Sequence, residues 1–147
     1  MRRRQTAPQQ WLIVRGAGDR AGLAAALRLR PGSGVLLLGP LPARELRKLR
    51  LRGLTIVQEH RGNAARVHDV RELRSALLVG MPLIFLSPLY PTATHPAWEP
   101  IPRMRAAALA RLSRGTLLAL GGMDARKFAR IRRLGFQGWA GISAFRI

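Results

Sequence analysis

The chain has 147 residues, of which 26 are Lys or Arg and 7 are Asp or Glu, giving a formal net charge of +19. A hydrophobic content of 48% excludes a disordered chain, and the lack of cysteine excludes disulfides and thiolate metal sites. No apolar run approaches the roughly 18 to 20 residues of a membrane span, and none near the start matches a signal-peptide core of about 7 to 15 residues. We therefore expect one cytoplasmic domain over residues 1–147 with no membrane partner, in which residues 1–9 form a disordered basic tail.

The positive charge raises nucleic acid as a partner, because clustered cations release counterions from phosphate. Against this, the arginines are spread along every expected helix, and only three Trp, one Tyr and four Phe are available to stack on bases. An Arg-rich composition on solvated helix faces explains the same charge, and it would also attract an anionic small substrate. Nucleic-acid binding therefore stands as the alternative from another functional class.

The first half of the chain alternates short apolar runs with amphipathic stretches. WLIV, GVLLL and LTIVQ are typical of strands buried on both faces, as in a parallel sheet. Asp19 is the expected N-cap of the first helix, and Gly53 ends the second. The expected strands are residues 10–15, 34–38 and 54–58, and the expected helices are residues 20–30 and 43–52.

The second half continues the alternation. Asp69 and Asp124 stand where helix N-caps belong, and Gly80 and Gly135 stand where helices end. The expected strands are residues 64–68, 83–86, 116–120 and 138–143, and the expected helices are residues 70–79, 103–114 and 125–134.

Strands that alternate with helices of ordinary length indicate an α/β fold with βα units around a parallel sheet. A full eight-stranded barrel takes about 250 residues and rarely fewer than roughly 200. We count seven strands, so the sequence predicts a shortened TIM-type (β/α) barrel. A missing barrel element exposes sheet edges that a second copy would cover, so a homodimer is a further hypothesis.

Polar residues follow two of the expected strands at the end where α/β folds place ligands. The loop after residues 83–86, SPLYPTATHP, carries Thr92, Thr94 and His95. Gly121 and Gly122 follow residues 116–120 and would allow an anion to approach the backbone, at the start of the helix over residues 125–134. These loops are the expected ligand site.

Four segments from His68 onward, VHDVRELRSA, LIFLSPLYPTATHP, LLALGGM and GFQGWAGISAF, resemble the thiamine phosphate synthase and thiazole tautomerase (TenI-like) family. Each pattern is common alone, but the four occur in the family's order and each includes the end of an expected strand. WLIV and GSGVLLLG resemble the first two strands of the family barrel more loosely.

The resemblance implies a barrel whose site lies at the carboxyl ends of its strands. In the synthases, an aminopyrimidine diphosphate loses pyrophosphate, and the thiazole phosphate nitrogen captures its methylene carbon. In the tautomerase branch, a histidine acts as general acid and base while the thiazole phosphate becomes aromatic. Expected partners are therefore thiazole phosphate and, for a synthase, aminopyrimidine diphosphate.

Matching by position gives the candidate site residues. His68 matches the tautomerase histidine, and His95 falls where the synthases usually have Lys. The positions that match phosphate or substrate contacts are Thr92, Thr94, His95, Gly121, Gly122, Gly141, Ile142 and Ser143.

The chain departs from the family where the synthases hold magnesium on the diphosphate. The second strand ends in GPLP, without carboxylate or amide, and the third ends in Gln58-Glu59-His60, where Glu59 is the one weak metal candidate. Mg²⁺ prefers carboxylates together with water and substrate phosphates. The cofactor is therefore Mg²⁺ only if synthase activity is retained, and the diphosphate half of the site is expected to be damaged.

Each candidate also has a purely structural explanation. His68 could cap or pack at the junction between its strand and helix, Thr92 and Thr94 could be ordinary turn hydroxyls, and His95 could be a loop residue. The resemblance favours a thiamine phosphate synthase, a transferase that acts on thiazole phosphate in thiamine biosynthesis. The alternatives within the family are a tautomerase-like enzyme that uses His68 and a non-catalytic phosphate binder.

Overall fold

The computed structural model describes residues 7–93, 95–114 and 116–145. The strands are β1 (Gln10–Val14), β2 (Gly34–Leu37), β3 (Thr55–Gln58), β4 (Ala65–Val67), β5 (Ile84–Leu86), β6 (Leu117–Leu120) and β7 (Gly138–Gly141). The α-helices are α1 (Arg20–Ala26), α2 (Ala43–Leu51), α3 (Val70–Leu78), α4 (Arg103–Leu112) and α5 (Ala125–Ile131). Three 3-10 helices are η1 (Glu59–Arg61), η2 (Arg132–Leu134) and η3 (Ser143–Phe145).

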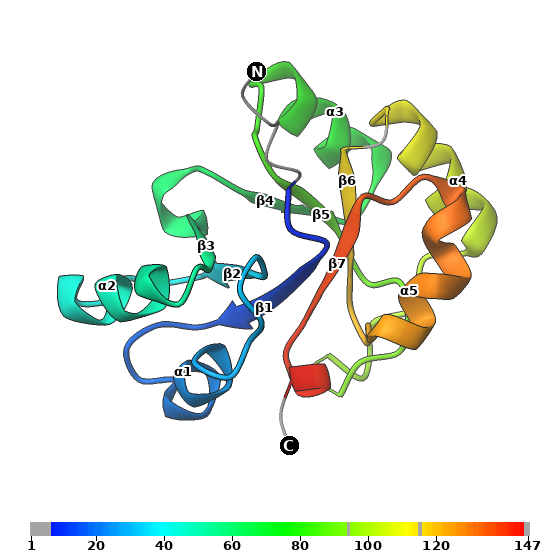
Figure 1. Cartoon of the computed structure of the whole chain (residues 1–147). Coiled ribbons are helices and arrows are strands. Elements are labelled where there is room, and N and C mark those ends of the chain that lie inside the picture. The colour runs from blue at the N-terminus through cyan, green and yellow to red at the C-terminus, as the bar shows by residue number, and fades with distance from the viewer. Residues whose placement is uncertain (1–6, 94, 115, 146–147) are drawn as a thin grey trace, which may run out of the picture.

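The strands form one parallel sheet in the order β3-β2-β1-β7-β6-β5-β4. The sheet curls, and the helices lie on its outer side, with α1 and α2 beside β1 to β3 and the other three beside β4 to β7 (Figure 1). Among the described residues, β3 and β4 are the sheet edges and are not paired with each other. The shortened (β/α) barrel predicted from the sequence is confirmed, and it remains open along the seam between these two strands.

The connection across this seam is unusually short. Only η1 and the three residues 62–64 separate β3 from β4, so no α-helix covers this part of the sheet. Gly62 ends η1 with a φ of 75°, a conformation that suits glycine. The α-helix that usually follows each strand of such a barrel is thus replaced by a tight turn after β3.

The inside of the curled sheet is filled by side chains that alternate along the strands. Trp11 and Phe85 meet there edge to face, with ring centroids 6.1 Å apart. The buried residues of this inner cluster are Trp11, Ile13, Leu36, Ala64, Phe85, Leu118, Leu120 and Ala140. The interior is therefore a packed core, so a ligand site has to lie in the loops at the strand ends.

The intervening strand residues face outward and pack on the helices. Leu12, Val14, Val35 and Leu37 belong to the cluster with α1 and α2. Residues of β4 to β7 pack with α3, α4 and α5 in a larger cluster that includes Leu73, Leu109 and Phe128. Burial on both faces explains why β1, β2, β5 and β6 are apolar runs. The edge strand β3 was expected to be buried in the same way, but its residues are exposed or half-buried because no strand pairs with its outer edge.

Several helices end earlier than the sequence pattern predicts. The first helix, expected to reach residue 30, ends at Ala26. The helix expected over residues 125–134 is helical to Ile131 and then tightens into η2 before Gly135, whose φ is 109°. The N-caps are as predicted, because the carboxylates of Asp19, Asp69 and Asp124 each accept a hydrogen bond from a backbone amide in the first turn.

The longest α-helix of the described chain, α4, has 10 residues. Within the described ranges, no helix is long and apolar enough to cross a membrane.

Candidate functional site at the carboxyl ends of the strands

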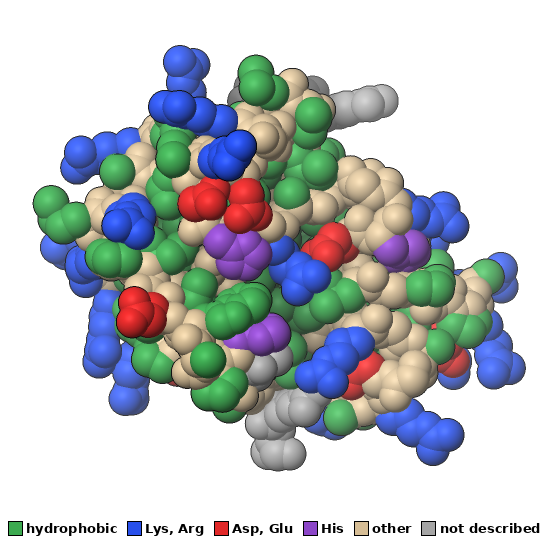
Figure 2. Space-filling model, turned by 180° about the vertical axis from the view of Figure 1, so that it is seen from behind, with side chains coloured by type: hydrophobic (Ala, Val, Ile, Leu, Met, Phe, Trp, Pro, Cys, Tyr) green, Lys and Arg blue, Asp and Glu red, His purple; other side chains and the backbone are tan. Residues whose placement is uncertain are grey.

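The loops after β3, β4 and β5 carry all three histidines of the chain. On the face shown in Figure 2, histidine and acidic side chains lie near the middle, whereas Lys and Arg lie mostly toward the outline. Parallel strands end at the same edge of a sheet, so these loops share one end of the barrel.

His68 follows β4 directly and stands one residue before the N-cap Asp69 of α3. Its Nδ1 lies 3.3 Å from Oε2 of Glu72, in the first turn of the same helix, and its side chain is 41% exposed. The ring also packs edge to face against Trp98, with centroids 5.4 Å apart. When Glu72 accepts the proton of Nδ1, Nε2 carries the free lone pair, which is the arrangement that a general base requires.

His95 is held by the same tryptophan. Its ring stacks on Trp98 with centroids 3.8 Å apart and planes 8° apart, and its carbonyl accepts a hydrogen bond from the Trp98 amide. The structure therefore joins the two candidate histidines through Trp98. Thr92 lies half-buried in the same loop, and Thr94 lies outside the described residues.

The loop between β5 and α4 packs closely on Gly121 and Gly122. The amide of Tyr90 donates to the Gly121 carbonyl at 3.1 Å. A Cβ atom on Gly122, whose φ is 60°, would lie 2.3 Å from the Pro91 carbonyl oxygen. These glycines are therefore needed for loop packing, in addition to any approach of an anion.

The cation beside this glycine turn is Lys127, in the first turn of α5. Its Nζ donates to the Gly122 carbonyl at 2.7 Å and lies 5.1 Å from the centroid of the Tyr90 ring. The α5 amino terminus itself is capped by Asp124, which accepts from the Lys127 amide at 2.7 Å. Sequence analysis did not select Lys127, although it is one of only two lysines in an arginine-rich chain.

The third group of predicted residues follows β7. Gly141 is the last, buried residue of the strand, and a Cβ atom there would lie 3.2 Å from the Met123 carbonyl oxygen. Ile142 packs partly against the inner core, and Ser143 begins η3 and is exposed. The ends of β6 and β7 are thus adjacent, as a shared phosphate site would require.

Glu59, the weak metal candidate, is engaged by an arginine across the open seam. Nη2 of Arg66 donates to Oε1 at 2.9 Å, and Nε lies 2.8 Å from Oε2, which is buried and receives no aligned hydrogen bond. Within residues 7–93, 95–114 and 116–145, no group of three or more His, Cys, Asp or Glu could hold a metal ion. The residues around Glu59 therefore do not fit a magnesium site.

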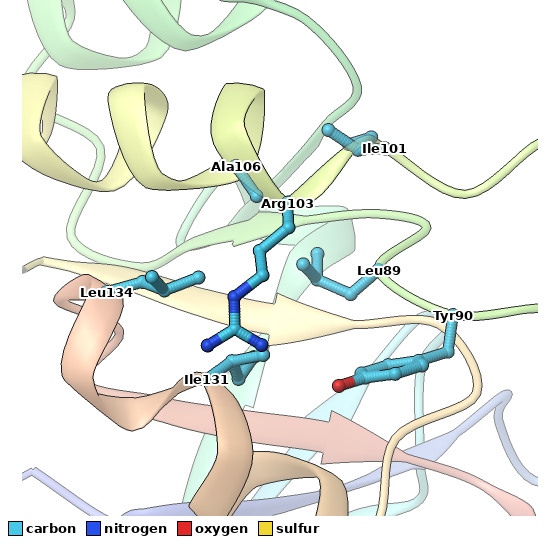
Figure 3. Close-up of a pocket in the computed structure, with 7 residues that line it drawn as sticks. All are labelled: Leu89, Tyr90, Ile101, Arg103, Ala106, Ile131 and Leu134. Carbon is cyan, nitrogen blue, oxygen red and sulfur yellow. The ribbon is translucent and has the colours of Figure 1, made fainter.

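Two hollows in the surface lie away from the histidines. One, of about 260 Å³, is lined by Arg15, Gly16, Gly18 and Asp19 after β1. The other, of about 180 Å³, lies between α4 and the end of α5, and its apolar lining also includes residues of the loop between β5 and α4 and of η2, with Tyr90 and Arg103 beside them. Figure 3 shows the Arg103 side chain extending from α4 toward Ile131 with Tyr90 beside it, and its Nη2 donates to the Arg130 carbonyl at 3.2 Å.

The carboxyl end therefore has two walls of different chemistry. One wall combines an imidazole paired with a carboxylate and a Trp98 surface, which suits proton transfer to or from a flat ring. The other combines the glycine turn with Lys127, which suits an anion. The seam between β3 and β4 is occupied by an ion pair and offers neither kind of group.

Comparisons with known proteins identify the family and agree with the fold. A family model described as thiamine monophosphate synthase matches residues 46–145. Among solved structures, the fold is similar to thiamine phosphate pyrophosphorylase from Pyrococcus furiosus, with 14% identity and a TM-score of 0.70 over 95% of this chain and 88% of that chain. No curated protein sequence matches significantly. Since the family model covers more than half of the chain, the chain belongs to the thiamine monophosphate synthase family.

Proposed function

We propose that this protein binds a thiazole phosphate and catalyses proton transfer on its ring, as a tautomerase-like member of the family. The observation that carries the proposal is the contact of His68 Nδ1 with Glu72 Oε2 at 3.3 Å, beside the indole of Trp98. A carboxylate that accepts from one ring nitrogen fixes the tautomer and leaves the other nitrogen to exchange a proton. In this proposal His68 is the acid and base, and Glu72 is a positioning residue.

The phosphate group is assigned to the other wall. Lys127 is held beside the Gly121–Gly122 turn, where a cation attracts an anion. Gly141 ends the neighbouring strand β7, Ile142 and Ser143 follow it, and Thr92 comes from the loop that packs on the turn. His95 comes from the same loop but stacks on Trp98 at the histidine wall. Thr94 is included from the family resemblance alone.

The magnesium-dependent condensation with aminopyrimidine diphosphate is the second candidate, because it is the activity that gives the family its name. It is less well supported here, since Glu59 is paired with Arg66 and the described part of the chain places no acidic cluster around it. Magnesium as a cofactor stays a conditional prediction, and no step of the proposed reaction depends on it.

The test follows two products in one set of incubations. The protein is given the non-aromatic thiazole phosphate isomer, and conversion to the aromatic isomer is followed by proton NMR. We expect turnover in wild type, a fall of about 10²-fold or more in His68→Ala, and a smaller fall in Glu72→Gln. A parallel incubation with aminopyrimidine diphosphate and Mg²⁺ is analysed for thiamine phosphate by chromatography.

The matched control is His60→Ala, which removes the exposed histidine of η1 and should leave the rate unchanged. An unchanged rate in His68→Ala would remove the acid/base assignment. Formation of thiamine phosphate would establish the condensation instead. Binding of thiazole phosphate without either product would leave a non-catalytic phosphate binder.

A further inference from the structure

The fold places the acidic residues of this protein at one end of the barrel, whereas basic residues lie at both ends. All seven acidic residues lie at the carboxyl end of the strands, as N-caps, in first helical turns, or in loops that follow a strand. They are Asp19, Glu45, Glu59, Asp69, Glu72, Glu99 and Asp124. The opposite end, where helices finish and strands begin, therefore has no acidic side chain.

The acid-free end carries exposed arginines from four of the five helices. They stand in the last helical turn, in η2, or in the loop that leads to the next strand. We call the following eight residues the amino-end arginines: Arg28, Arg30, Arg50, Arg52, Arg111, Arg114, Arg132 and Arg133. In the sequence they look dispersed, but the topology brings them to one end of the molecule.

Hydrogen bonds join the segments that carry these arginines. The Gly32 amide donates to the Gly53 carbonyl at 2.9 Å, which links the loops after α1 and α2. The Gln10 side chain donates to the Ser33 hydroxyl at 3.0 Å, and the Trp139 amide donates to the Gln9 carbonyl at 2.8 Å. These contacts extend from the loop before β2 through the starts of β1 and β7.

On the far side, the Gln137 amide donates to the Leu117 carbonyl at 2.8 Å. This contact joins the loop after η2, which follows Arg132 and Arg133, to the start of β6, which the loop after α4 precedes. The four segments that carry the amino-end arginines are therefore neighbours at this end of the sheet.

The charge of the amino-end arginines is not neutralised within the described chain. The ion pairs described there join Lys48 to Glu45, Arg66 to Glu59 and His68 to Glu72, and none includes one of the eight. A helix such as α2, with 9 residues, separates its two ends by roughly 13 Å. This separation exceeds the Debye length of about 8 Å at physiological ionic strength, so the distant acids do little to cancel the local field.

One of these arginines occupies an unfavourable backbone position. Arg114 follows Ser113, the C-cap of α4, with a φ of 55° in the left-handed region. Glycine is the usual residue there because a Cβ atom costs conformational energy. Glycine at this position would make the fold more stable, so the arginine side chain is retained at a cost to stability. This favours a role for the side chain in binding rather than in folding.

We propose that the amino-end arginines bind the phosphodiester backbone of nucleic acid without selecting bases. Arginine forks match phosphate oxygens, and neutralising several phosphates releases counterions. Phe136 is the one aromatic residue in the sequence of these four segments, and it is only 4% exposed. Because these segments have no exposed aromatic ring to stack on bases, we expect them to bind the phosphate backbone whatever the base sequence.

The experiment measures fluorescence anisotropy with two labelled 20-base-pair DNA duplexes of unrelated sequence, over a range of NaCl concentrations. We expect the wild-type protein to bind both duplexes equally, within about twofold, and its affinity to fall steeply with salt. The decisive variant is R28Q/R30Q/R50Q/R52Q. It should lose at least about tenfold in affinity near physiological salt and show a shallower salt slope, by about 2 to 4.

The matched control is R20Q/R44Q/R71Q/R105Q, which removes the same number of charges from exposed positions in the first turns of α1 to α4. We expect this control to lose less than about threefold. A second amino-end variant, R111Q/R114G/R132Q/R133Q, should repeat the loss and covers the case in which the first does not fold.

Several outcomes would overturn the proposal. These are equal losses in the control and amino-end variants, strong preference for one duplex, or no wild-type binding near physiological salt. Attachment to phosphatidylserine vesicles without DNA binding would indicate a membrane surface instead. Thiazole phosphate should not displace DNA, so the outcome is independent of catalysis at the opposite end.

Discussion

The two ends of the barrel use charge in different ways. At the carboxyl end, the carboxylates of Asp69 and Asp124 accept backbone amides at 2.8 and 2.7 Å, and Glu59 is paired with Arg66. Each of these acids completes a local structure. At the amino end, the eight amino-end arginines are exposed, and none of them takes part in the ion pairs of the described chain. Charge at one end therefore belongs to the fold and the candidate site, whereas charge at the other end is available to a partner.

The candidate site residues lie on only one side of the carboxyl end, and the packing of the strands explains this asymmetry. The histidine wall and the glycine turn rest on β4 to β7, which pack with three helices around the larger outer cluster. Beyond β3 only η1 and a tight turn lead to β4, and the Glu59–Arg66 ion pair lies at this open seam. The residues that match the family site thus lie on the strands that pack against more helices.

The largest expected effect tests whether the glycine turn is structural. Gly122→Ala places a Cβ atom 2.3 Å from the Pro91 carbonyl oxygen at a φ of 60°, so we expect the free energy of unfolding to fall by about 2 to 4 kcal/mol in urea denaturation. Gly62→Ala is the control, because its φ is 75° but nothing lies within 4 Å. It should lose only about 1 kcal/mol, and equal losses would show that loop packing is not the cause.

The next effect concerns the acids as caps. Asp124→Ala removes the acceptor of the Lys127 amide, and we expect it to lower the free energy of unfolding by about 1 kcal/mol. Asp124→Asn keeps an acceptor oxygen and should lose only a few tenths of a kcal/mol. If both variants lost the same amount, the charge of Asp124, and not its hydrogen bond, would carry the effect.

A smaller effect is expected for the Glu59–Arg66 ion pair at the seam between β3 and β4. In a double-mutant cycle of Glu59→Gln and Arg66→Gln, we expect a coupling free energy of about 0.5 to 1 kcal/mol, because the Arg66 side chain is 42% exposed and partly screened. The coupling should shrink in high salt. A coupling near zero would mean that the open edges are held by core packing alone.

The smallest effect has the opposite sign and concerns the amino end. Arg114→Gly relieves a left-handed arginine, so it should raise the free energy of unfolding by about 0.5 kcal/mol. Arg111→Gly is the control inside the last turn of α4 and should lose about 1 kcal/mol. A loss of stability in Arg114→Gly would show that this side chain serves the fold and would weaken the contrast between the ends.

The sequence predicts which residues belong to most of the candidate site, but not which of them contact one another. His68, His95 and Gly122 were placed at strand ends because strands and caps follow from local patterns. The link through Trp98 could not be predicted, since ring stacking depends on how the loop after β5 folds back toward α3. Lys127 was missed for a similar reason: its contacts with Gly122 and Tyr90 join residues from two loops.

The homodimer remains a hypothesis from the open edges of β3 and β4. Sizing chromatography tests it, because a homodimer of the 16.2 kDa chain would elute at twice the mass of the monomer.

What the sequence alone determined is the order of strands and helices, their caps and the family resemblance, because these depend on residues near one another in the chain. The tertiary structure decided which distant groups meet. It paired Glu59 with Arg66 at the open seam, joined the two histidines through Trp98, and brought dispersed arginines to one end of the barrel. The physical reason is that a parallel sheet brings the ends of all its strands together, whatever their separation in sequence.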